Sequence, residues 1–221
     1  MKTGKLPAAN TWIRNLESQL SSSEQRLLSS LDSPSKIQSF LNSIPYSDDH
    51  FYRCPLQFLR DRKGHCFDGA LFAAMAMRRI GYAPLILELI PNERDDDHLL
   101  ALYKQQGCWG AVAQSNFTGL RYREPVYRSL RELVMSYFED FFNSIGEKTL
   151  RGYRGPIHLV TFDHLDWMSN DAGLEELADG MDRYLIHPIL TDEIAAGLSL
   201  MDDRSLRAGL MGANAAGLFK I

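Results

Sequence analysis

The chain has few of the features that would assign it to a specialised class of protein. It contains three cysteines, and an odd number does not indicate a disulfide framework. No apolar run approaches the roughly 20 residues that a membrane-spanning helix needs. The net charge of −4 excludes the surplus of basic residues that is typical of nucleic-acid-binding domains. We therefore expect neither a membrane nor a nucleic acid as partner.

The start of the chain also lacks a recognisable targeting signal. Met1–Pro7 contains two lysines but no apolar segment follows it, so it does not match a secretory signal. The expected location is therefore the cytoplasm, where thiols stay reduced. The sequence contains no internal repeat and no clear linker, and its 221 residues suit one domain of generous size. We expect a single domain over residues 1–221.

Two kinds of hydrophobic period are present in the first half of the chain. Apolar residues recur at helical spacing over the first 44 residues, and the segment from Cys66 to Arg79 is apolar on almost every side. Runs at 84–90, 98–104 and 108–114 then predict strands, with a hairpin turn that uses Gly107. A central helix packed on a small antiparallel sheet is an α+β fold.

The residues from 119 to 221 predict a mostly helical extension packed on that core. Pro125 suits the first turn of an amphipathic helix within 121–143. A loop is expected at 149–156 and one further strand at 157–162. Helical patterns return at 173–186 and from Thr191, and the tail from Leu206, rich in Gly and Ala, is expected to be loosely ordered.

Cys66 stands at the start of the apolar helix, directly after Gly64 and His65. The unpaired N–H groups and the dipole of a helix N-terminus lower a thiol pKa, and a thiolate is a nucleophile. The alternative is a small core residue, because free cysteine is among the most buried residue types. The helix alone does not separate the two interpretations.

A thiolate nucleophile needs a base within hydrogen-bond reach, and the base needs an orienting partner. His98 begins a predicted strand, and polar residues end the strand that follows. The run Asp95–Asp97 beside His98 raises the alternative of a metal site, but a structural metal needs more His or Cys ligands nearby. We therefore interpret the run as a solvated loop and expect no metal and no cofactor.

The positions that fit this arrangement are Gly64-His65-Cys66 with Ala70, Arg79-Ile80-Gly81-Tyr82-Ala83-Pro84, His98, and Gly107-Cys108-Trp109. In this pattern the sequence resembles the transglutaminase-like branch of the papain-like superfamily. In that family G-x-C opens the central helix, and the histidine and its orienting acid lie on adjacent strands. The resemblance covers residues 35–118 and implies a transglutaminase-like core there, with helical additions on both sides.

The chain departs from the family pattern at the third catalytic position. The family has an aspartate four residues after the strand tryptophan, where this chain has Ala113. The resemblance to papain-like proteases, in which an asparagine orients the histidine, implies Asn116 for this role, with Ser115 as the alternative. An amide or a hydroxyl fixes the ring but stabilises an imidazolium less than a carboxylate does.

Two segments rich in arginine and tyrosine follow this core. Arg121 and Arg123 in the first, with Arg151 and Arg154 in the second, are able to hold an anionic substrate group bidentately if both segments flank the cleft. The competing interpretation is a set of salt bridges with the 28 acidic residues, and it is the one we favour.

Together these features predict a cysteine-dependent acyl-transfer enzyme. Cys66 would attack the carbonyl, His98 would be the base, and Asn116 would orient it. The substrate would be a peptide or protein amide, with any anionic group bound by Arg121 and Arg123, and hydrolysis is favoured over cross-linking because water is the default acceptor. The alternative is a catalytically inactive binding or scaffold protein of the same fold, which the missing aspartate favours. A purely helical interaction protein with Cys66 in its core is a third interpretation.

Overall fold

Six strands of residues 9–221, the part of the chain that this computed structural model describes, form one antiparallel sheet in the order β4-β3-β2-β1-β5-β6. Met1–Pro7, the segment tested above for a targeting signal, lies outside the described residues. The strands are β1 (Leu85–Pro91), β2 (His98–Gln105), β3 (Cys108–Val112), β4 (Arg123–Tyr127), β5 (Leu150–His158) and β6 (Ile186–Pro188). The predicted α+β class is confirmed, whereas the transglutaminase-like core stays a prediction.

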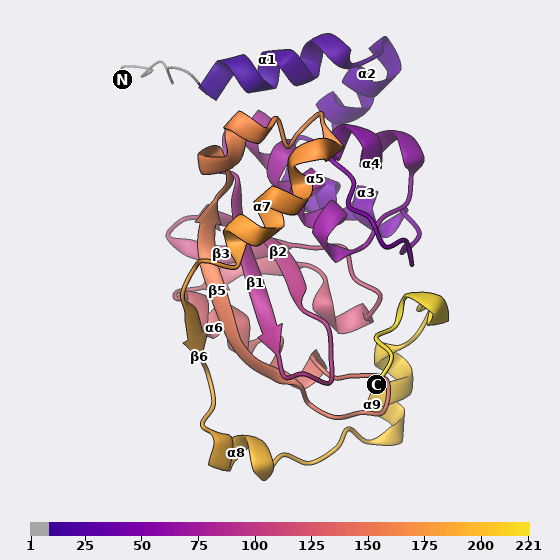
Figure 1. The fold of residues 1–221 in the computed structure, drawn as a ribbon, viewed down its shortest axis with the longest axis vertical. Coiled ribbons are helices and arrows are strands. Elements are labelled where there is room, and N and C mark those ends of the chain that lie inside the picture. The colour runs from indigo at the N-terminus through magenta and orange to yellow at the C-terminus, as the bar shows by residue number, and fades with distance from the viewer. Residues whose placement is uncertain (1–8) are drawn as a thin grey trace.

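Helices surround this sheet, with α1 and α2 at the top of the view in Figure 1 and α8 and α9 toward the bottom. No helix between residues 9 and 221 is both long and apolar enough to cross a membrane. The helices are α1 (Ala9–Gln19), α2 (Ser22–Ser30), α3 (Pro34–Asn42), α4 (Pro55–Asp61), α5 (Cys66–Arg79), α6 (Leu130–Met135), α7 (Leu174–Met181), α8 (Asp192–Ala196) and α9 (Asp203–Gly209).

The central helix α5 has the predicted bounds and is buried from Cys66 to Arg78. This burial on all sides explains why its sequence is apolar almost all round. A glycine allows the helix to approach the end of β3 closely, since a Cβ atom at Gly69 would lie 2.1 Å from the Cβ of Gln114. The start of α5 is therefore fixed closely against the sheet.

The two faces of the sheet bury separate sets of apolar side chains, and β2 supplies both. Leu99, Ala101 and Tyr103 pack in the core that contains α5. Leu100 and Leu102 pack in the other core, which contains residues of α6. Since successive strand residues point to opposite faces, this register decides which polar residues at the start of β2 can face α5.

The region after residue 119 differs from the predicted helical extension, because it adds β4, β5 and β6 to the sheet. Pro125 lies in β4, an edge strand, where its missing N–H costs no ladder hydrogen bond. The strand β5 occupies the segment expected to be a loop, because pairing with β1 satisfies its backbone. The segment expected to be a strand is instead largely the 3₁₀ turn Leu159–Leu165.

Candidate functional site

Cys66 borders a cavity of about 500 Å³. The walls come from the segment before α4, the start of α5, the facing ends of β1 and β2, the helix α7 and the end of the chain. Among the described residues, no lysine or arginine lines this cavity, although His50 and His65 do. The carboxylates in its lining are Asp48, Asp49, Glu88, Asp96, Asp97, Glu175 and Asp182. The cavity around the thiol is therefore acidic.

The Cys66 thiol is 8% exposed, and its sulfur lies 3.9 Å from the main-chain carbonyl oxygen of Asp97. Burial raises the pKa of Cys66, and the carboxylates of Asp97 and Asp96 raise it further. The helix N-terminus acts in the opposite direction, but it is outweighed here. The expectation of a lowered pKa is thus wrong for this arrangement, and the thiol is protonated at neutral pH.

His98 is buried on the other face of the sheet. It lies opposite Leu89 in the β1–β2 register, on the side of Leu100. Its Nε2 lies 2.7 Å from the carbonyl oxygen of Leu120, which sets Nε2–H as the donor. Burial lowers the pKa of His98 to about 4, so the ring is neutral at pH 7. The described geometry brings Cys66 and His98 to different faces and forms no thiolate–imidazolium pair.

Asp97 occupies the position that faces Cys66. Asp97 lies two residues before Leu99 of β2, and both residues line the Cys66 cavity. His98, which lies between them, does not line it. Burial, and then the neighbouring Glu88 carboxylate, raise the pKa of Asp97 to about 8. The sequence pattern predicted a solvated loop at Asp95–Asp97, and it is the observed β1–β2 register that places Asp97 rather than His98 on the α5 face.

Cations outside the lining partly compensate these acids, with Arg53 and Lys63 paired to Asp49, and Arg154 on the strand β5 paired to the acids nearest Asp97. Arg154 is the cross-strand neighbour of Glu88 and forms ion pairs with Glu88 and with Asp182, the latter at 2.7 Å. Its Nε atom is buried without a hydrogen-bond partner among the described residues. One cation therefore serves Glu88 and Asp182 while Asp97 retains a proton, and this part of the cavity is short of positive charge.

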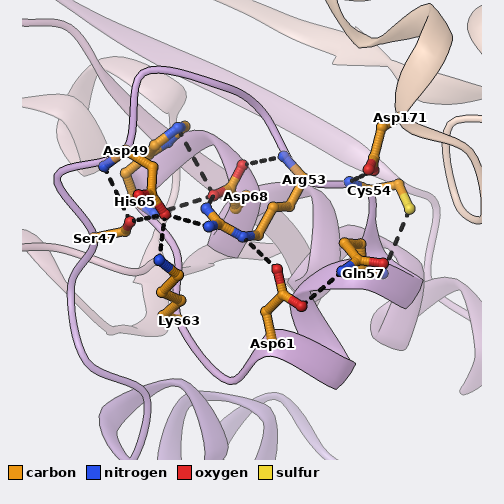
Figure 2. A network of polar contacts seen from close by, with 10 residues as sticks. All are labelled: Ser47, Asp49, Arg53, Cys54, Gln57, Asp61, Lys63, His65, Asp68 and Asp171. Atoms are coloured by element: carbon orange, nitrogen blue, oxygen red, sulfur yellow. Dashed lines mark hydrogen bonds and ion pairs between the residues drawn. The ribbon is translucent and has the colours of Figure 1, made fainter.

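A buried ionic network fixes the start of α5 (Figure 2). Arg53 is fully buried and pairs with Asp49, with Asp61 at 3.0 Å and with Asp68 at 3.5 Å. The Asp68 carboxylate also accepts the backbone N–H of Arg53 at 2.8 Å and that of His65 at 3.2 Å. This last contact caps α5 directly before Cys66, so the position of the thiol depends on Arg53.

Asn116 and Ser115 make other contacts than the predicted one to His98. The Asn116 amide donates to the carbonyl of Asn214 at 2.9 Å and accepts the Asn214 N–H at 2.7 Å. The Ser115 hydroxyl accepts the backbone N–H of Phe117 at 3.1 Å. Asn116 thus holds the C-terminal segment of the chain, a partner that no sequence pattern indicated.

Of the four arginines predicted to bind an anion, Arg121 and Arg123 lie away from the Cys66 cavity, whereas Arg154 pairs with two of its acids. Arg121 donates to the carbonyl of Ser115 at 3.1 Å and borders a second cavity of about 470 Å³. Arg123 lies on β4, pairs with Asp140 at 3.3 Å and stacks over the Tyr137 ring at 3.9 Å. Arg123 is engaged in structural contacts, as the competing interpretation anticipates, and neither arginine lines the cavity at Cys66.

Comparison with known proteins gives a remote structural likeness. No family model and no curated protein matches the chain. Among solved structures it is similar to Legionella pneumophila LapG, at 16% identity and a TM-score of 0.34 over 51% of this chain and 72% of that one. The EGTA-treated form gives the same values. The calcium-bound form has the same identity and TM-score over 48% and 71%. Similarity at this level carries no argument about the chemistry of the site.

Metal binding has no support in the part of the chain that the structure describes. Within residues 9–221, no group of three or more His, Cys, Asp or Glu side chains is arranged to hold a metal ion. The carboxylates of the Cys66 cavity come from several elements of the fold.

Proposed function

We propose that this chain binds a cationic, amine-bearing organic ligand in the Cys66 cavity without catalysing acyl transfer. The observation that carries the proposal is that Asp97, and not His98, shares the cavity with Cys66. A carboxylate facing the thiol raises its pKa and attracts a cation, whereas an imidazole would have lowered it.

The charge distribution of the cavity supports a cationic ligand. Burial, and then the neighbouring Glu88, raise the pKa of Asp97 to about 8, while Arg154 is shared between Glu88 and Asp182. A ligand ammonium or guanidinium group would replace that proton and form charge-assisted hydrogen bonds with both carboxylates. The volume of about 500 Å³ is in the range of small-molecule sites.

Titration calorimetry with matched probes tests this proposal. We expect 1,4-diaminobutane and arginine amide to bind, and the neutral 1,4-butanediol and the anionic succinate not to bind. Replacing Asp97 by Asn should weaken diamine binding by about tenfold, because it removes one charge-assisted contact. Asp192→Asn on the exposed helix α8 is the matched control and should bind as wild type does. Equal binding of succinate and the diamine would refute the proposal.

A cysteine-dependent acyl transferase or hydrolase is the second candidate. It is favoured by one observation, that Cys66 begins a 14-residue helix and borders a cavity. In this candidate Cys66 is the nucleophile, His98 the base and Asn116 the orienting residue, and the β2 register has to change to bring His98 to the thiol.

The pH dependence of iodoacetamide labelling separates the two candidates. Cys54 and Cys108 are first replaced by Ser, so that only Cys66 reacts. The binding proposal predicts slow labelling that accelerates only at alkaline pH and does not change in His98→Ala. Rapid labelling well below the thiol's ordinary pKa of about 8.5, slowed by His98→Ala, would establish the enzyme instead.

A further inference from the structure

The end of the chain lines two neighbouring cavities. Residues 212–214 border the second cavity, and residues 216–219 border the Cys66 cavity. We call residues 212–219 the C-terminal strap. Tyr46 lines both cavities as well, so the strap and Tyr46 together separate them. The strap continues from α9, which Figure 1 shows in yellow beside the C-terminus.

A small set of polar contacts holds the strap. Asn116 pairs in both directions with the backbone of Asn214, at 2.7 and 2.9 Å. The Asn214 side chain donates to the carbonyl of Tyr46 at 3.1 Å. Gly217 approaches Tyr46 so closely that a Cβ atom there would lie 3.1 Å from the ring. The Asn116 amide thus recognises main chain, and the surface beside Gly217 leaves little room for a side chain, so the groove fits the short 3₁₀ turn Ala215–Gly217 that Asn214 caps.

Little apolar surface holds the strap in place. No residue from 190 to 221, all of which the structure describes, is buried. Segments with few buried contacts open at a low free-energy cost compared with global unfolding. The helix α9 has contacts of its own that do not involve the strap, because Thr118 donates to the carbonyl of Ala208 at 3.0 Å and Gly209 packs directly on the Phe142 ring. Release can therefore be confined to the strap.

We infer that the C-terminal strap is a reversible cover, held as an intramolecular peptide ligand by Asn116 and Tyr46, that controls access to the Cys66 cavity. Docking of the strap closes one wall of the cavity, and its release opens that wall to solvent and ligand. The inference rests on the proposed function only in sharing the Cys66 cavity. Its test uses thiol labelling, which needs no cationic ligand, so the two can fail separately.

The test compares iodoacetamide labelling of Cys66 at fixed alkaline pH in the background with Cys54 and Cys108 replaced by Ser. One variant ends at Met211, which retains α9 and removes the strap. A second, Asn116→Ala, keeps the full chain and removes the two-way contact with Asn214. The control Asn15→Ala loses an amide that contacts Asp166 instead. Circular dichroism and thermal unfolding establish that each variant is folded.

We expect labelling to accelerate by about tenfold in both strap variants and to remain unchanged in the control. A synthetic peptide of residues 210–221, added at millimolar concentration to the shortened chain, should restore protection, because it supplies the strap in trans. Unchanged labelling in the folded Asn116→Ala variant overturns the inference. Acceleration that the peptide does not reverse also overturns it, since the groove would then not hold the segment as a ligand.

Discussion

The coupling between cation binding and a proton on Asp97 gives a quantitative prediction. Burial and Glu88 raise the pKa of Asp97 to about 8, so the carboxyl is protonated in the empty site at neutral pH. A cation replaces this proton, and its affinity therefore increases with pH until Asp97 is ionised. By simple titration Asp97 is about 1% ionised at pH 6 and about 90% ionised at pH 9, which limits the gain in affinity over this range to about 90-fold.

Titration calorimetry of 1,4-diaminobutane between pH 6 and pH 9 measures this gain. The ligand stays cationic over most of this range because alkyl ammonium groups have a pKa near that of lysine, about 10.4. Repeating the titration at pH 6.5 in two buffers of different ionisation enthalpy should reveal release of about one proton per bound ligand. Asp97→Asn should remove both the proton release and the increase with pH.

Substitutions separate Asp97 from the other titratable groups of the cavity, which include His50, His65 and Asp96. The pKa of Cys66 is raised, so the thiol remains neutral over the tested range. The pKa of Asp96 is also raised, mainly by burial, and Asp96→Asn is the matched control that keeps Asp97 intact. Affinity that is independent of pH, or proton uptake on binding, would refute the reasoning for the wild type. If the affinity of the Asp97→Asn variant still increases with pH, the proton released on binding comes from another carboxyl group.

Three further predictions concern the framework of the site. Arg53→Met should lower the free energy of unfolding by about 3–5 kcal/mol in urea titrations, because it removes the cation paired with the buried Asp68. A loss below about 1 kcal/mol would mean that water reaches this network. Gly69→Ala should cost about 3 kcal/mol or more, because its Cβ would overlap the side chain of Gln114, and an unchanged melting temperature would contradict that close approach. Burial lowers the pKa of His98 to about 4, so the stability that the neutral ring contributes at pH 7 is lost as pH falls from about 6.5 toward 4. In proton NMR the His98 ring signals should not titrate between pH 5 and pH 8. A titration midpoint near 6.5 would contradict the burial of the ring.

The sequence predicted well those parts of the fold that local physics determines. The helix from Cys66 to Arg79 was predicted with its observed bounds, because apolar residues on all sides and the neighbouring glycines are local signals. The strands β1 and β2 followed for the same reason. The strand β5 was missed, since its glycines and arginines disfavour a strand locally and only pairing with β1 stabilises it. The edge strand β4 was mistaken for a helix because Pro125 fits either position.

The candidate site was predicted in part, and the limit was the register of one strand. The sequence identifies Cys66 as a helix-start thiol, and the structure places it beside a cavity. It does not reveal which of Asp97 and His98 faces α5, because a shift by one residue exchanges the two faces of a strand. The observed pairing of Leu89 with His98 resolves this choice. Asn116 could not be assigned either, because its partner Asn214 lies 98 residues further along the chain.

The position of Asp97, rather than His98, beside the Cys66 thiol determines the chemistry that the site can support. A helix N-terminus contributes roughly half a positive charge, which is sufficient to favour a thiolate only where no carboxylate opposes it. Here burial raises the pKa of Cys66, and Asp97 and Asp96 raise it further, so the thiol stays protonated. Beside the thiol, Glu88 and Asp182 share Arg154 and Asp97 has no ion pair among the described residues, so this part of the cavity has fewer cations than acidic groups. The acidic groups that keep the thiol protonated are the same groups that would attract a cation. Substitution of Asp97 therefore separates cation binding from catalysis most directly.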